Sequence, residues 1–155
     1  MDVLRKQSFT NLNLQICLNY FSLFSVLYLL IIGSLVYQKI LFYQYQNFQI
    51  QKYLLPFLFL IWFLIEIIRI CYGFTGNLYE KVSDLLTYLL MTLFPQIPLI
   101  FYLTFFQELL FPIDILMGVL MMIGLILQLF YGYYTLRIFI TNQTAQFLRL
   151  CDHPE

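Results

Sequence analysis

The chain has 155 residues, of which 62% are hydrophobic and only 10% are charged. A water-soluble domain normally carries about 25% charged residues, so this composition excludes a soluble globular protein and indicates an integral membrane protein. The formal net charge is zero, which excludes a basic face for nucleic acid. We therefore expect a single all-α transmembrane domain over residues 1–155, with short cytoplasmic tails and with membrane lipids around it.

Four apolar segments are predicted to cross the membrane and to form a four-helix bundle. A helix needs about 20 apolar residues to cross a bilayer. The expected helices cover residues 16–37, 54–72, 85–106 and 113–140. The first segment is too long for the core of a signal peptide and no small-residue cleavage site follows it, so we expect it to be retained.

The first predicted helix contains several small polar residues. They are Asn19, Ser22, Ser25 and Ser34, and we expect most of them to bond to the backbone of their own helix. The tyrosine-rich segment 38–53 is predicted to be a loop whose aromatic rings lie at the membrane–water interface. A ligand-binding loop is the alternative for this segment.

Glu66 and Arg69 lie inside the second predicted helix, whereas the other helices are expected to lack internal charge. The two residues share one helix face because they are three positions apart. Either charge would cost about 2.5–3.5 kcal/mol at the centre of a membrane helix. Arg69 is near enough to the expected helix end to snorkel, whereas Glu66 needs a partner, for which Arg69, Gln128 and Thr92 are candidates. The pair indicates a transport path or a buried structural contact, and the lack of a second deep acidic group favours the contact.

The second helix is expected to end in a tight elbow with the sequence Gly-x-x-Gly-Asn-Leu. Gly73 directly follows the apolar run and suits a helix C-cap. Gly76 allows backbone angles that are closed to other residues, and Asn77 can close a turn with its side chain. We expect this elbow, which ends at Leu78, to contact other protein subunits.

Pro95 and Pro98 lie at the centre of the third predicted helix. Each proline removes a hydrogen bond to the carbonyl four residues earlier, so the helix should kink. Thr92 or a water molecule would then have to satisfy the freed carbonyls. The kink can either bend the helix around its neighbours or open a cavity.

The fourth predicted helix is longer than a bilayer is thick, so its last turns near Arg137 should protrude or the helix should tilt. Gly124, Gln128 and Gly132 recur at every fourth position on one face of this helix. Such a stripe suits close contact between helices. Glycine is common in membrane helices, however, so chance spacing is an equal alternative.

Four spans place both ends of the chain on one side of the membrane. The basic residues on that side are Arg5, Lys6, Arg69, Lys81, Arg137 and Arg149, against Lys39 and Lys52 on the other side. The positive-inside rule therefore predicts cytoplasmic termini. Cys17, Cys71 and Cys151 would then be free thiols in a reducing compartment, with palmitoylation of Cys71 or Cys151 as a minor alternative. Asn142, in an Asn-x-Thr acceptor pattern, would stay unmodified.

No catalytic or metal-binding set is evident in the sequence. His153 is the single histidine, and three cysteines do not form an even disulfide set. We therefore expect no enzyme activity, no cofactor, no metal and no small-molecule substrate. The alternative function is a small transporter or channel subunit with a polar path at Glu66 and at the Pro95/Pro98 kink.

One set of residues resembles a known family. Glu66-Ile67-Ile68-Arg69, followed by Gly73 and then Gly76-Asn77-Leu78, resembles the signature of the family of transmembrane proteins 17, 216 and 80. Asn13-Leu14-Gln15-Ile16 is similar to the Pro-Leu-Gln start of that family, with Asn13 in place of proline. The stretches 76–82, 96–99 and 134–137 are most similar to the transmembrane protein 17 branch. The resemblance covers roughly residues 13–150.

This resemblance implies a membrane component of the ciliary transition zone. Such a protein acts in the tectonic-like complex with other transition-zone membrane proteins, and supports cilium assembly and the membrane diffusion barrier at the ciliary base. We expect structural or partner contacts at Glu66, Arg69, Gly73, Gly76, Asn77, Leu78, Gly124, Gln128 and Gly132.

Overall fold

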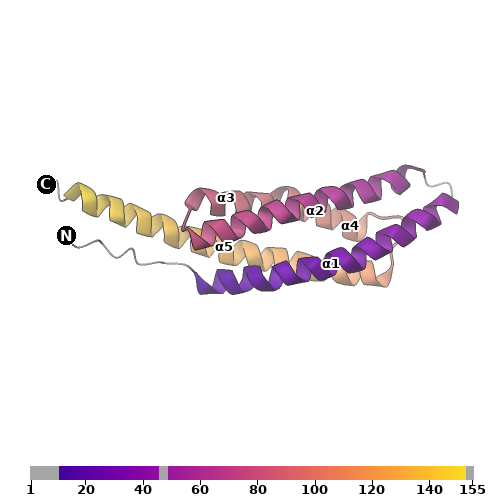
Figure 1. Ribbon diagram of the computed structural model, residues 1–155, viewed down its shortest axis with the longest axis horizontal. Helices are drawn as coiled ribbons and strands as arrows, with labels where there is room; N and C mark the ends of the chain where they lie inside the picture. The colour runs from indigo at the N-terminus through magenta and orange to yellow at the C-terminus, as the bar shows by residue number, and fades with distance from the viewer. Residues whose placement is uncertain (1–10, 46–48, 153–155) are drawn as a thin grey trace.

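The computed structural model describes residues 11–45 and 49–152, and every regular element in these ranges is helical. The elements are α1 (Leu12–Tyr45), α2 (Gln49–Leu78), α3 (Val82–Met91), η1 (Thr92–Gln96), α4 (Ile97–Phe105) and α5 (Pro112–Asp152). They form an elongated bundle in which α1 begins and α5 ends at the same end (Figure 1). At that end α5 runs past the other helices.

The described residues contain four helical segments that are long and apolar enough to cross a membrane. They are Leu12–Phe42, Lys52–Leu78, Val82–Phe105 and Pro112–Leu148. The third combines α3, η1 and α4. The predicted all-α, four-helix membrane bundle is therefore confirmed.

The helices extend beyond the expected boundaries, most clearly at the connection between α1 and α2. The segment 38–53 was expected to be a loop, but the described part of it is mostly helical, since α1 continues to Tyr45 and α2 begins at Gln49. The apolar run marks only the part of a helix that meets lipid. Intrahelical hydrogen bonds also satisfy the backbone beyond that part, so the helix continues into the polar zone.

Two apolar clusters fill the bundle interior. Trp62 is fully buried in the larger cluster, where its ring lies 4.8 Å from that of Tyr28. The smaller cluster, near the start of α1, includes Leu18 and Tyr88. Along each span, buried polar residues lie between the two clusters, and five of these residues form the site described below.

The third span is interrupted where the two prolines predicted a kink, and this prediction is confirmed. Thr92–Gln96 forms a π-helical turn, and within it Phe94 leaves helical geometry with φ −148° and ψ 115°. Pro98 lies in the first turn of α4, where a missing N–H costs little. The Thr92 hydroxyl donates to the Tyr88 carbonyl at 2.7 Å, and not to the carbonyls that the prolines free.

The expected elbow after residue 72 is wrong, because α2 continues through Gly73 and Gly76 to Leu78. The chain turns instead at residues 79–81, where Glu80 adopts a positive φ of 54°. Gly76 is needed for a different reason. A Cβ atom at Gly76 would lie 2.7 Å from the backbone nitrogen of Leu85, so the absence of a side chain allows α2 and α3 to approach closely.

Candidate functional site

Five polar side chains meet between the two apolar clusters, and we call them the central polar cluster. They are Ser25 from α1, Glu66 and Arg69 from α2, Gln96 from η1 and Gln128 from α5. All five are at least 95% buried. Every membrane span therefore contributes at least one side chain to this cluster.

Both carboxylate oxygens of Glu66 accept hydrogen bonds. Oε1 accepts from Arg69 Nη2 at 2.6 Å and from Ser25 Oγ at 2.5 Å. Oε2 accepts from Arg69 Nε at 3.0 Å and from Gln96 Nε2 at 2.6 Å. The arginine therefore binds the carboxylate with two parallel N–H groups, which is the strongest geometry for this ion pair.

Arg69 lies inside the bundle and does not snorkel, so this expectation was wrong. Its side chain is fully buried, and α2 continues for nine more residues to Leu78. Arg69 Nη1 donates to Gln128 Oε1, and the guanidinium lies 5.6 Å from the ring centroid of Tyr88. Gln128 was a candidate partner for Glu66, but in the structure it binds Arg69.

Sequence reasoning missed Ser25 and Gln96 as members of this cluster. Ser25 was expected to bond to its own helix, as the Ser34 hydroxyl does by donating to the Ile31 carbonyl at 2.7 Å. The sequence contains a signal for Ser25, because Ser25 lies seven residues from both Leu18 and Ile32 and therefore shares their helix face. The structure shows that this face is buried. No comparable signal marks Gln96, whose inward position depends on the geometry of the interrupted span.

Asn77 joins the end of α2 to the start of α1. Its Oδ1 accepts from the Asn11 N–H at 3.2 Å, and its Nδ2 donates to the Asn11 carbonyl at 3.3 Å and to Gln15 Oε1 at 2.8 Å. Asn11 Nδ2 donates in turn to Thr135 Oγ1 of α5 at 2.8 Å. Asn77 and Asn11 thus link α2, α1 and α5, and Asn77 does not close a local turn.

The predicted glycine stripe on α5 faces the bundle. A Cβ atom at Gly124 would overlap the Phe21 ring of α1, and one at Gly132 would lie 2.7 Å from a Leu89 methyl group. Gly73 is also buried, and a Cβ atom there would lie 2.8 Å from Leu18. Of the predicted contact residues, Leu78 alone is exposed, with 58% of its surface accessible.

A second buried ion pair, which was not predicted, lies at the end of the bundle away from the start of α1 and the end of α5. Lys39 Nζ lies 2.5 Å from Asp114 Oδ2, and the two side chains are only 0% and 2% exposed. Lys39 also donates to Gln107 Oε1 and lies 5.3 Å from the Phe111 ring centroid. Because Lys39 belongs to α1 and Asp114 to α5, the expectation that only the second helix carries internal charge is wrong.

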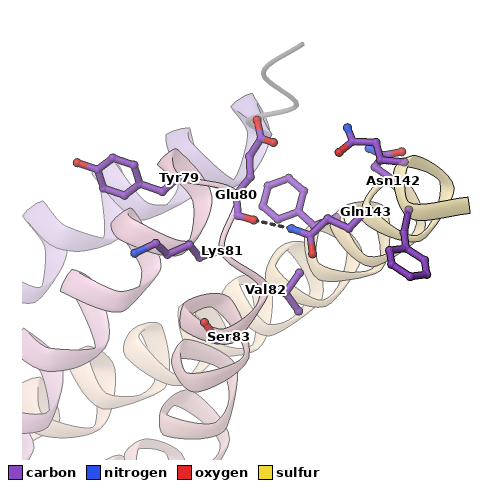
Figure 2. A pocket seen from close by; sticks show the side chains of 10 residues that line it. Tyr79, Glu80, Lys81, Val82, Ser83, Asn142 and Gln143 are labelled. Atoms are coloured by element: carbon purple, nitrogen blue, oxygen red, sulfur yellow. Dashed lines mark hydrogen bonds between the residues drawn. The ribbon is translucent and has the colours of Figure 1, made fainter. Parts of the chain in front are cut away.

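A pocket of about 720 Å³ lies between the α2–α3 turn and the protruding part of α5. Figure 2 shows Gln143 Nε2 donating to the Glu80 carbonyl across this pocket, at 3.0 Å. Asn142, the residue of the glycosylation pattern, lines the same pocket from within helix α5. This pocket is at the end of the bundle and includes no residue of the central polar cluster.

Within the described ranges, no three His, Cys, Asp or Glu side chains are grouped to hold a metal ion. Cys17 and Cys71 are free thiols. Arg5, Lys6 and His153 lie outside the described residues, as do the side chains of Arg149 and Cys151.

Comparisons with a family model and with individual known proteins point to the same family. The family model Transmemb_17, described as "Predicted membrane protein", matches residues 16–125. Transmembrane protein 17 of Gallus gallus is 31% identical over 109 residues, which cover 66% of this chain and 52% of the relative. The Bos taurus protein of that name is 38% identical over 90 residues (57% and 45%), and the Homo sapiens protein is 34% identical over 85 residues (54% and 43%). No solved structure matches this chain.

The chain spans about half the length of the curated relatives it matches. The region matched by the family model contains the Glu66–Arg69 pair and the Gly73–Leu78 stretch that carried the sequence resemblance. Since the model covers more than half of the chain, this protein belongs to the transmembrane protein 17 family.

Proposed function

We propose that this protein is a non-enzymatic membrane component of the ciliary transition zone. In this role it acts within the tectonic-like complex, where it supports cilium assembly and the diffusion barrier at the ciliary base. Membership of the transmembrane protein 17 family supports the proposal. The family signature also coincides with the residues that hold the bundle together, Glu66 and Arg69 among them.

The observation that favours a scaffold over a transporter is the saturation of Glu66. Its two carboxylate oxygens accept four hydrogen bonds, from Arg69, Ser25 and Gln96. A carboxylate that relays ions or protons must exchange its partners during each cycle, and this carboxylate is held by side chains from three helices. The arrangement suits a fixed contact that orders the four spans.

The proposed orientation places both chain ends in the cytoplasm. The start of α1 and the end of α5 lie at one end of the bundle (Figure 1). Arg69 and Lys39 are buried and cannot anchor a loop. By position in the sequence, five other basic residues are then assigned to the side of the chain ends and Lys52 to the opposite side. The positive-inside bias therefore persists after the buried charges are removed. Leu78, Tyr79 and Lys81 are exposed at the proposed cytoplasmic end and are available to partner proteins.

The proposal is tested by localisation in ciliated cells. Glu66→Ala and Arg69→Ala each leave the other charge unpaired in the bundle, and we expect both variants to lose accumulation at the transition zone. Ser34→Ala is the matched control, because the Ser34 hydroxyl bonds only to its own helix. Normal localisation of both charge variants would contradict the packing role, and absence of the unaltered protein from the transition zone would contradict the proposed location.

A flux assay separates the scaffold from a transporter. The purified protein is placed in liposomes, and ion and proton flux is measured for the unaltered chain and for Glu66→Gln. We expect no flux above that of empty liposomes for either. Flux that disappears with Glu66→Gln would reject the scaffold and favour a transporter or channel subunit.

A further inference from the structure

The outward side of α1 carries an exposed asparagine on an apolar surface. We call one line of exposed residues on this side the α1 outer face; it runs through Asn19, Leu23, Val26, Leu30 and Tyr37, and other exposed residues of α1 lie beside it. The buried side of α1 packs against α2 and α5. The four apolar members are between 54% and 67% exposed, so nothing in the bundle covers them.

Asn19 is the unusual member of this face. It lies within the span Leu12–Phe42, six residues before Ser25, which is about 9 Å along the helix axis. Its side chain makes no hydrogen bond to any described residue. An amide has two donors and one acceptor oxygen to satisfy, and hydrocarbon offers no partner for them. A partner on a neighbouring helix removes this cost.

Two outward threonine hydroxyl groups on other spans do not have this deficit. Thr75 Oγ1 of α2 donates to the Cys71 carbonyl at 3.0 Å, and Thr87 Oγ1 of α3 donates to the Ser83 carbonyl at 2.9 Å. Ser34 of α1 likewise bonds to its own helix. A hydroxyl in a helix can thus be satisfied locally, whereas Asn19 is left with an unmet requirement that faces outward.

We propose that the α1 outer face is the interface of a homodimer, in which the Asn19 amides of two copies bond to each other. All copies of a membrane protein insert in the same orientation, so two copies meet in parallel. A two-fold axis along the membrane normal then places each residue at the depth of its own equivalent. An amide both donates and accepts, so it can pair with an identical amide.

The α1 outer face forms a continuous line along which two copies of α1 can pack. Successive members are four, three, four and seven residues apart, which is the repeat of a left-handed helix pair with a single polar position. Leu23, Val26 and Leu30 would form the apolar contact beside the amide pair. This inference goes beyond the proposed function and does not depend on a ciliary location.

Dimer formation is tested with the full chain in lipid vesicles over a range of protein-to-lipid ratios. The dimer fraction is measured by energy transfer between donor- and acceptor-labelled copies. We expect dimers for the unaltered chain and an association at least about fivefold weaker for Asn19→Leu, which corresponds to about 1 kcal/mol. Leu64→Ala, on the exposed face of α2, is the matched control and should leave association unchanged. Because Asn19 is exposed, Asn19→Leu should keep its helical circular dichroism.

Cross-linking tests the geometry in a chain whose native cysteines are replaced by serine. Val26→Cys should form disulfide-linked dimers in vesicles under mild oxidation, and adding Asn19→Leu should reduce their yield. Leu64→Cys should not cross-link. A monomer at every dilution, an association unaffected by Asn19→Leu, or cross-linking through residue 64 instead of residue 26 would each overturn the proposal.

Discussion

Glu66–Arg69 and Lys39–Asp114 are both buried ion pairs, but they join the chain in different ways. Glu66 and Arg69 are three residues apart on α2, so the pair forms within one helix and the other spans bond to it. Lys39 and Asp114 are 75 residues apart, and their contact itself connects α1 to α5. The first pair can be recognised from spacing along one helix, whereas the second exists only because two distant segments meet.

The two pairs also differ in how completely they are satisfied. Both oxygens of Glu66 have partners, whereas Asp114 Oδ1 bonds to no described residue. Asp114 Oδ2 also accepts the Phe111 N–H at 3.0 Å, at the start of α5. This bond and the positive end of the helix dipole stabilise the Asp114 carboxylate even without Lys39. The central pair has no such local support, so its members depend more strongly on each other.

The largest effect is expected from removing one charge of the central pair. Arg69→Leu leaves the Glu66 carboxylate buried without its cationic partner, and should destabilise the bundle by about 3–5 kcal/mol. The free energy of unfolding can be measured by denaturing titration in mixed micelles, followed by the fluorescence of Trp62, the single tryptophan. The double variant Glu66→Leu/Arg69→Leu should be more stable than Arg69→Leu alone. Equal stability of Arg69→Leu and the unaltered chain would show that the pair does not hold the bundle.

A smaller effect is expected from removing one charge of the Lys39–Asp114 pair. Lys39→Met removes the ion pair but leaves Asp114 with the Phe111 N–H and the start of α5, so the cost should be about 1–3 kcal/mol. The same micelle titration gives the comparison directly. If Lys39→Met costs as much as Arg69→Leu, the distinction between the two pairs is wrong.

The smallest effect on the free energy of unfolding is expected from removing a single hydrogen bond of the central polar cluster. It can be compared with the removal of a hydroxyl that lies outside the cluster. Ser25→Ala removes a donor to Glu66 and should cost about 1 kcal/mol, which is typical of hydrogen bonds between membrane helices. Ser34→Ala on the same helix should change the free energy of unfolding by no more than about 0.5 kcal/mol, because that hydroxyl donates only to the Ile31 carbonyl. Indistinguishable titrations for the two variants would show that the hydrogen bond from Ser25 to Glu66 does not stabilise the bundle.

The fold class followed from composition and from the lengths of the apolar runs, but the site followed only in part. Glu66 and Arg69 stood out because a charge in an apolar run is costly. Lys39 did not, because it lies at the edge of an apolar run and looks like an interfacial residue until Asp114 is placed beside it. The boundary of α2 was misplaced for a similar reason. Gly73 and Gly76 suggest a helix end, whereas in the structure their missing side chains make room for Leu18, Leu85 and Tyr88.

The sequence alone determined that this protein is helical, that it crosses a membrane four times and that its second span carries a charge pair in need of partners. These properties depend on local quantities, namely apolar length, residue spacing and the cost of charge in hydrocarbon. The tertiary structure decided which partners are used. Ser25, Gln96 and Gln128 reach the central pair, Asn77 reaches Asn11, and Lys39 reaches Asp114. These contacts depend on the rotation and depth of each helix relative to its neighbours, which are set by packing between spans and not by any one span.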